Sequence, residues 1–169
     1  MIDTAPLIAE ITAAFDGAAR EDGVSLRESR VIDDYGCDEE RAEARLLDTD
    51  TRWQDVSDPD MQRYDGVLTF SDAKGFRYYL PAHMLRDLRL YVHPTYGFSS
   101  DTLSGLQISS IPGMRDYKLE QFALITPEQG RAVCSFLEFI VVHGDEYHRQ
   151  DAADALTAYW SRYCDGDAE

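Results

Sequence analysis

Histidine and cysteine are the residues of this chain best suited to metal binding or nucleophilic chemistry, and there are four of the first and three of the second. His143 and His148 lie five residues apart in the polar segment 143–148, which separates them by roughly 140° around a helix. A metalloprotease pair needs a four-residue spacing on one helical face. We therefore interpret the segment as a polar connector between two helices and predict no metal site.

The cysteines do not form a recognisable catalytic or disulfide pattern. Cys37, Cys134 and Cys164 are odd in number and include no Cys-x-x-Cys motif, which is typical of reduced thiols in a cytoplasmic protein. Cys134 falls in an apolar helical stretch and is expected to be a small buried residue. The N-terminus has no basic region followed by an apolar run, so a signal peptide is not predicted.

Motifs for nucleotide or acyl chemistry are also missing. The sequence has no glycine-rich phosphate loop, no Gly-x-Ser-x-Gly and no dinucleotide-binding glycine pattern. We predict no cofactor and no catalytic residues, and we favour a protein that is not an enzyme.

Charge is the strongest compositional signal. The net charge is −16, and residues 1–66 hold 18 acidic against 7 basic side chains, a net of −11. Such a field repels nucleic acid and anionic membranes but attracts a basic protein. Two alternatives also explain the charge: it keeps the protein soluble and has no other role, or it mimics the phosphates of DNA in an inhibitor. The candidate partner-binding residues are Asp33, Asp34, Asp38, Glu39, Glu40 and Glu43.

The apolar pattern predicts an α+β fold that is mainly helical, with a small two- or three-stranded antiparallel sheet packed against helices. The chain is expected to form one domain, 1–169, with an acidic helical part at 1–50 and a core at 52–163. Capping residues predict helix starts at Ser25 and Thr126. The expected strands are 67–70, 76–80 and 122–125, the first two joined by a turn at 71–75; the expected helices are 4–19, 25–36, 38–47, 58–64, 81–92, 127–143 and 156–163.

Five short motifs occur in order: Arg52-Trp53, the octapeptide GFRYYLPA at 75–82, TPEQ at 126–129, Phe136-Leu137 and Tyr159-Trp160. Together they resemble a bacterial family of unknown function over about residues 52–160. The acidic segment 20–50 lies outside this resemblance, and His83 stands where an aromatic residue is expected. The resemblance implies a cytoplasmic bacterial α+β domain and brings no established activity or site residue to this chain.

Two hypotheses for function follow. The first is a cytoplasmic, bacterial, acidic interaction protein of the immunity or inhibitor kind, without catalysis. The second is a small-ligand-binding protein or enzyme, with a site formed by the long predicted loop 94–115 and by Arg52, Trp53, Arg77, Tyr79 and His83. The alternative to a ligand site is that these aromatic side chains belong to the core and the arginines only bridge to the acidic surface.

Overall fold

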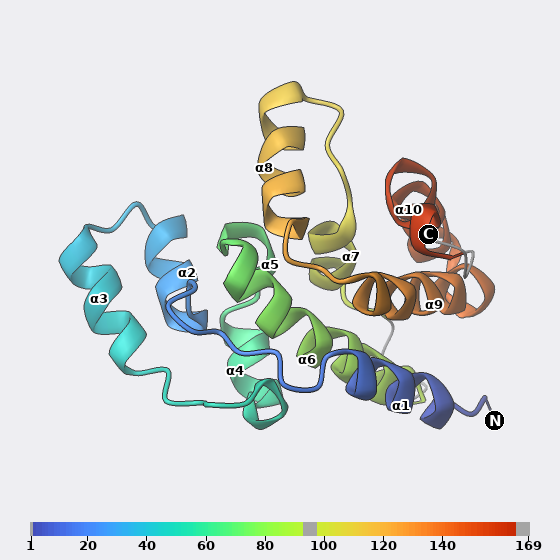
Figure 1. Ribbon diagram of the computed structural model, residues 1–169, viewed down its shortest axis with the longest axis horizontal. Helices are drawn as coiled ribbons and strands as arrows, with labels where there is room; N and C mark the ends of the chain where they lie inside the picture. Colours follow the sequence, from blue (N-terminus) through green and yellow to red (C-terminus); the bar gives the residue numbers. More distant parts are fainter. Residues whose placement is uncertain (1, 93–97, 165–169) are drawn as a thin grey trace.

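The computed structural model describes residues 2–92 and 98–164, and in these two stretches every regular element is a helix (Figure 1). Residues 93–97, which include the first four residues of the predicted loop 94–115, lie outside the described residues. The elements are α1 Ala5–Ala14, α2 Leu26–Asp33, α3 Asp38–Leu46, η1 Trp53–Asp55, α4 Asp58–Arg63, α5 Val67–Phe70, α6 Ala73–Tyr91, α7 Ser100–Leu106, α8 Pro112–Phe122, α9 Pro127–His143, α10 Glu146–Ala158 and η2 Trp160–Tyr163.

The predicted sheet is wrong, and the fold is all-α rather than α+β. The expected strands 67–70 and 76–80 are helix α5 and the first half of α6, and 122–125 is the end of α8 with the turn that follows it. Helix α6 is buried on nearly all sides, so its apolar residues form a continuous run instead of a stripe. Such a run cannot be told from a buried strand by periodicity alone.

The segment 71–75, predicted as a hairpin turn, instead links two helices: Ser71 ends α5, Asp72 is the N-cap of α6, and 73–75 begin that helix. The Asp72 carboxylate accepts hydrogen bonds from the amides of Gly75, at 2.9 Å, and Val24, at 3.0 Å. It therefore caps α6 and ties this helix to the segment that precedes α2. Gly75 does not supply a positive φ; it allows a close approach, because a Cβ there would lie 2.5 Å from the Val24 carbonyl oxygen. Pro81, the expected first residue of a helix, lies inside α6.

Aromatic side chains from three parts of the chain pack around α6. The ring centroid of Phe122 on α8 lies 5.1 Å from that of Phe76 on α6 and 4.8 Å from that of Trp160. The Trp160 indole is fully buried and donates a 2.8 Å hydrogen bond to the carbonyl oxygen of Leu106 at the end of α7. Burial of such large rings supplies much of the apolar area of the core.

Polar side chains of α8 support the short helix α5. The Gln121 amide donates to the carbonyl oxygen of Ser71 at 2.6 Å, and the Tyr117 hydroxyl donates to that of Thr69 at 3.0 Å. These carbonyl groups end a helix and have no partner within it, so a neighbouring element must satisfy them. A four-residue helix is stable here because its tertiary partners complete its hydrogen bonds.

Several helix boundaries predicted from capping chemistry are confirmed. Ser25 with Glu28 and Thr126 with Gln129 both form reciprocal capping boxes. The described part of the predicted loop 94–115 is not a continuous loop, because it holds α7 and the start of α8. In the described parts of the chain, no helix is both long enough and apolar enough to cross a membrane.

The expectation of three reduced thiols does not hold for two of the cysteines. Cys134 on α9 and Cys164, directly after η2, are joined by a disulfide, and Cys37 is free and exposed. The packing of η2 against α9 brings the two residues together, although 30 positions separate them in the sequence. Neither that packing nor the pairing could be read from the cysteine spacing.

Candidate functional site

Helices α2 and α3 form a hairpin at one end of the molecule, and we call residues 25–47 the acidic arm (Figure 1). The arm contacts the rest of the protein chiefly through α2, which packs against α3 on one side and α5 on the other. The N-terminus of α3 is stabilised by Glu40, whose carboxylate accepts a 2.8 Å hydrogen bond from the Cys37 amide.

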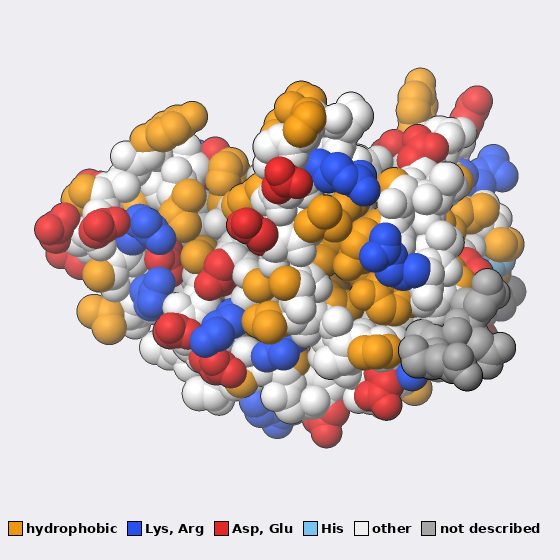
Figure 2. Space-filling view, turned by 45° about the horizontal axis from the view of Figure 1, so that its top comes forward, with side chains coloured by type: hydrophobic (Ala, Val, Ile, Leu, Met, Phe, Trp, Pro, Cys, Tyr) orange, Lys and Arg blue, Asp and Glu red, His pale blue; other side chains and the backbone are white. Residues whose placement is uncertain are grey.

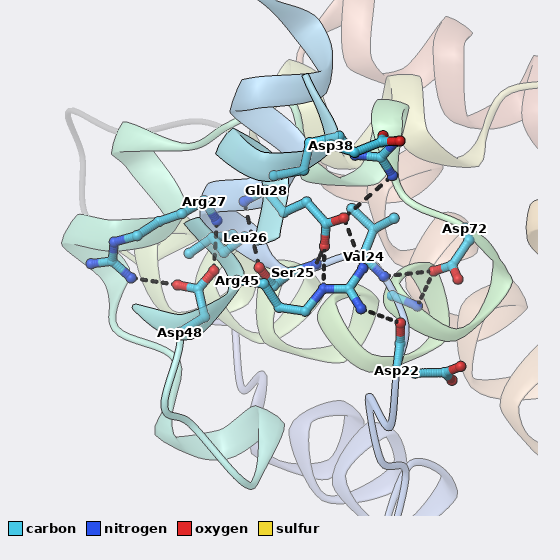
Figure 3. Close-up of polar contacts among 12 residues, drawn as sticks. Asp22, Val24, Ser25, Leu26, Arg27, Glu28, Asp38, Arg45, Asp48 and Asp72 are labelled. Carbon is cyan, nitrogen blue, oxygen red and sulfur yellow. Dashed lines mark hydrogen bonds and ion pairs between the residues drawn. The ribbon is translucent and has the colours of Figure 1, made fainter. Parts of the chain in front are cut away.

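A buried carboxylate holds the two helices of the arm together (Figure 3). Glu28 on α2 is 1% exposed, and the Arg45 guanidinium on α3 donates to both of its oxygens, at 2.8 and 2.9 Å. Arg41 on α3 donates to Glu28 at 3.3 Å, and the Ser25 amide donates at 3.1 Å. A carboxylate with several charge-assisted donors is stable in the interior, whereas an unpaired one is not.

These partners decide the charge state of Glu28. Burial on its own would raise the pKa of the Glu28 carboxyl, but hydrogen bonds from Arg45 and Ser25 and the positive charges of Arg45 and Arg41 outweigh it. The net result is a pKa below the ordinary value, so Glu28 is ionised at neutral pH.

A second ion pair fixes the other side of the arm. Arg27 on α2 contacts Asp48, whose side chain is buried (Figure 3). It also pairs with Asp60 at the start of α4. The Asp48 carboxylate also accepts a 2.7 Å hydrogen bond from the Arg27 amide. Arg27, Arg41 and Arg45 thus turn toward the buried carboxylates of Glu28 and Asp48.

All six predicted partner-binding residues lie on the arm, but they do not all have the same role. Asp34 pairs with Arg30 at 3.0 Å, and Asp33 lies 3.8 Å from the same guanidinium. Asp38 is 3.4 Å from Arg41. Glu40 caps α3, so part of its function is structural. Glu39 and Glu43 are exposed on α3 and make no ion pair with any described residue.

Sequence reasoning missed the exposed hydrophobic side chains of the arm. Tyr35 is 96% exposed, and Leu46 and Leu47 are 79% and 66% exposed. In the space-filling view, hydrophobic and acidic side chains lie together at this end of the molecule (Figure 2). Exposed apolar groups bordered by charge are a common property of protein-binding surfaces.

Tyr35 also has an unfavourable backbone conformation. Its φ is +58°, the left-handed region that a residue with a Cβ adopts at a cost of about 1–2 kcal/mol. The conformation ends α2, because it lets the Gly36 amide donate to the Val31 carbonyl oxygen at 2.8 Å. Glycine would fill this position without strain. A tyrosine that is both strained and exposed indicates a role outside the fold.

The residues of the predicted ligand site divide between the core and the surface. Trp53 and Tyr79 are core residues: the Trp53 indole donates to the Phe15 carbonyl oxygen at 2.9 Å, and the Tyr79 hydroxyl accepts from the Leu26 amide at 3.1 Å. Arg52 is exposed, and Arg77 is half-buried. Among the described residues, no hydrogen bond or ion pair links any two of these side chains or His83. A ligand site at this position stays a prediction.

His83 is instead one of several buried polar residues of α6 and α7. His83, Asp87 one turn later and Thr102 on α7 are all buried, and His83 Nε2, the Asp87 carboxylate oxygens and the Thr102 hydroxyl make no hydrogen bond that meets normal geometry in the described structure. Burial lowers the pKa of His83 to about 3, with a further contribution from the charge of Arg86. Burial raises the pKa of Asp87 to about 7, although the nearby Thr102 hydroxyl and a backbone amide group oppose the rise.

An apolar groove of about 540 Å³ lies between α8 and α10, lined in part by Met114, Tyr117 and Lys118. Burial lowers the pKa of the Lys118 amine to about 8. This amine donates to the carbonyl oxygens of Leu68, at 3.3 Å, and Gly105, at 3.1 Å. Its hydrogen bonds therefore join α8 to α5 and α7, which is a structural role.

The other histidines are separated by the fold. His143 ends α9 and packs on Phe139, with ring centroids 4.6 Å apart, whereas His148 lies on α10 with its Nδ1 2.8 Å from the Asp145 carboxylate. The Asp145 side chain also caps α10 through the His148 amide. The segment thus connects two helices, as its polar composition indicates.

Comparison with known proteins places the chain in a family but assigns no activity. The model of DUF6714, a family of unknown function, matches residues 3–164, so the chain belongs to that family. The match includes the acidic segment 20–50, which the motif resemblance had left out. No curated protein and no solved structure matches this chain.

Loss of the buried carboxylate should loosen the arm. We expect Glu28→Gln to lower the free energy of unfolding by about 1–3 kcal/mol at pH 7, because Arg41 and Arg45 lose their shared charged acceptor. Since the folded-state pKa of Glu28 lies below its ordinary value of 4.5, its stabilising effect is present at neutral pH and is lost as pH falls through the folded-state pKa. Urea unfolding from pH 3 to 7 measures both effects; an equal difference between the two proteins at every pH would contradict them.

The buried Asp87 gives the opposite pH dependence. Its folded-state pKa is raised from 3.8 to about 7, so it destabilises the fold increasingly as pH rises between these values. We expect Asp87→Asn to match the wild type near pH 4 and to be more stable by about 1–3 kcal/mol at pH 8. Thermal unfolding tests this, with the exposed Asp116→Asn as control. His83 is present in both proteins, so its own titration cancels in the difference between their stabilities. A variant that is less stable than the wild type at pH 8 would refute the assignment of this pH dependence to Asp87.

Proposed function

We propose that this protein is a cytoplasmic interaction module without catalytic activity, whose acidic arm docks on a basic protein as an immunity or inhibitor protein does. The observation that carries the proposal is the surface composition of the arm, which combines six acidic side chains with exposed Tyr35, Leu46 and Leu47. The carboxylates would attract and orient the partner, and the apolar side chains would be buried in the complex.

The internal ion pairs of the arm support this proposal. Arg41 and Arg45 hold α3 on α2 through Glu28, so this packing does not depend on the exposed carboxylates of α3 that make no ion pair. Those carboxylates, Glu39 and Glu43, are then available to a partner at little cost to the fold. Charge on such a protruding surface mainly raises the rate of association, and the effect weakens as salt screens it.

The same charge argues against two other partner classes. A surface rich in carboxylates repels the phosphate groups of nucleic acid and of anionic lipid, so we expect direct binding to neither. The partner would instead present lysine and arginine around an apolar recess that accepts Tyr35.

Neutralising the outer face of α3 should slow the encounter with the partner. We expect the triple variant Asp38→Asn, Glu39→Gln, Glu43→Gln to lower the association rate constant by roughly tenfold at low salt and much less at high salt. Glu40 is left unchanged because it caps α3. The partner is first obtained by affinity capture from native lysate, and its binding kinetics are then measured by surface plasmon resonance.

The matched control removes the same charge from elsewhere on the surface, as Asp116→Asn, Glu120→Gln, Glu146→Gln. These residues are exposed on α8 and α10. We expect the control to keep most of the wild-type rate. Equal slowing by both triple variants would show that net charge alone matters and that the arm has no special role. Failure to capture any stoichiometric basic protein would contradict the proposal itself.

Replacement of Tyr35 should raise the stability of the protein but weaken its binding to the partner. We expect Tyr35→Gly to raise the free energy of unfolding by about 1 kcal/mol, because glycine relieves the strained φ. It should nevertheless weaken partner binding by roughly tenfold or more through faster dissociation. Tyr147, which is 84% exposed on α10, provides the control Tyr147→Gly in the same binding assay. Unchanged affinity for the Tyr35 variant would remove this residue from the interface.

A further inference from the structure

A second group of reactive side chains lies on α9 and η2, far from the arm in the sequence. Glu138 is one helical turn beyond Cys134 on α9, so both side chains lie on one face of the helix. Cys164 reaches the same point from the end of η2. Both sulfur atoms and a Glu138 carboxylate oxygen lie within 4.8 Å of one another. The Cα atoms of the two cysteines are 5.5 Å apart.

The three groups lie at an open groove rather than in the core. The groove has a volume of about 440 Å³ and is lined by both cysteines and by Glu10, Glu128 and Glu138, with Arg131 as its basic residue. Three carboxylates against one guanidinium make the local field favourable for a cation. Cys134 itself is buried, whereas Cys164 is half-buried and Glu138 exposed, so an ion from solvent can reach the cluster.

Reduction changes what this cluster can bind. The Cys134–Cys164 disulfide takes up two electrons and two protons from a dithiol reductant. The protein then carries two thiols, and the reductant becomes a disulfide. Thiolates and a carboxylate are ligands that zinc accepts, at sulfur–zinc distances of about 2.3 Å. Binding then releases the two thiol protons to solvent. The same pair of cysteines, when they occur in a reducing compartment, is better explained by metal binding than by a permanent cross-link.

We propose that Cys134, Cys164 and Glu138 form a zinc site when the disulfide is reduced, with water as the fourth ligand. Two sulfurs that share one tetrahedral zinc ion lie about 3.8 Å apart, so they must move away from each other when the bond opens. Cys134 is held in the middle of α9, whereas Cys164 follows the last short helix and can make this adjustment. The inference is independent of the proposed partner of the acidic arm, because it rests on residues at a different surface.

Zinc binding by the two redox forms tests this site. The starting protein is Cys37→Ser, which removes the one exposed free thiol. It is reduced with dithiothreitol, desalted under argon and titrated with zinc against a chromophoric chelator. We expect one zinc ion per reduced chain and none for the oxidised chain. Cobalt in place of zinc should show a thiolate-to-metal charge-transfer band in the reduced protein alone.

Two ligand variants and one control variant assign the ligands. Glu138→Gln keeps both cysteines, and we expect it to weaken zinc binding by roughly tenfold or more, whereas Glu128→Gln in the same groove should change it by less than about twofold. Cys164→Ser should abolish the charge-transfer band, with circular dichroism to verify folding. Equal zinc binding by the reduced and oxidised proteins, or full affinity in Glu138→Gln, would overturn the proposal.

Discussion

Burial of α6 on nearly every side is the constraint on which the structure depends. A helix in this position has little water around it, so polar groups on it and at its N-cap bond to other elements, and those that do not, such as Asp87, have shifted pKa values. Asp72 accepts the Val24 amide, the Tyr79 hydroxyl accepts the Leu26 amide, and the Tyr78 hydroxyl donates to Asp50 at 2.7 Å. These three bonds attach the N-terminal segment on both sides of the acidic arm to the core.

The arm uses its charges for two different purposes. Arg27, Arg41 and Arg45 face inward, where Glu28 and Asp48 hold the helices in place, whereas Arg30 and the remaining carboxylates lie at the surface. Pairs formed with a buried carboxylate are sensitive to the loss of one partner, whereas exposed pairs such as that of Arg30 with Asp34 add little to stability. Neutralising Glu39 or Glu43, which make no ion pair with any described residue, should therefore change the stability of the fold little.

The disulfide and the arm lie at opposite ends of the molecule. Figure 1 places α3 at one end, and α9 lies toward the other. The arm is held by ion pairs and hydrogen bonds, and the other end by aromatic packing and a covalent bond that a thiol can open. A change of redox state would therefore act first on η2 and α9, while the acidic surface stays as it is.

The features that the sequence alone determined are the ones that arise from composition or from interactions between residues close together in the chain. Capping boxes at Ser25 and Thr126 are short-range hydrogen bonds, so residue order determines them, and the excess of carboxylates before residue 66 needs no structure to be seen. The tertiary structure decided that 67–80 is helical, because surrounding α6 with packed side chains removes the polar face that would have identified it. It also decided that the arginines turn inward, that Tyr35 is exposed and that Cys134 meets Cys164, since each depends on contacts between distant segments that no local pattern encodes.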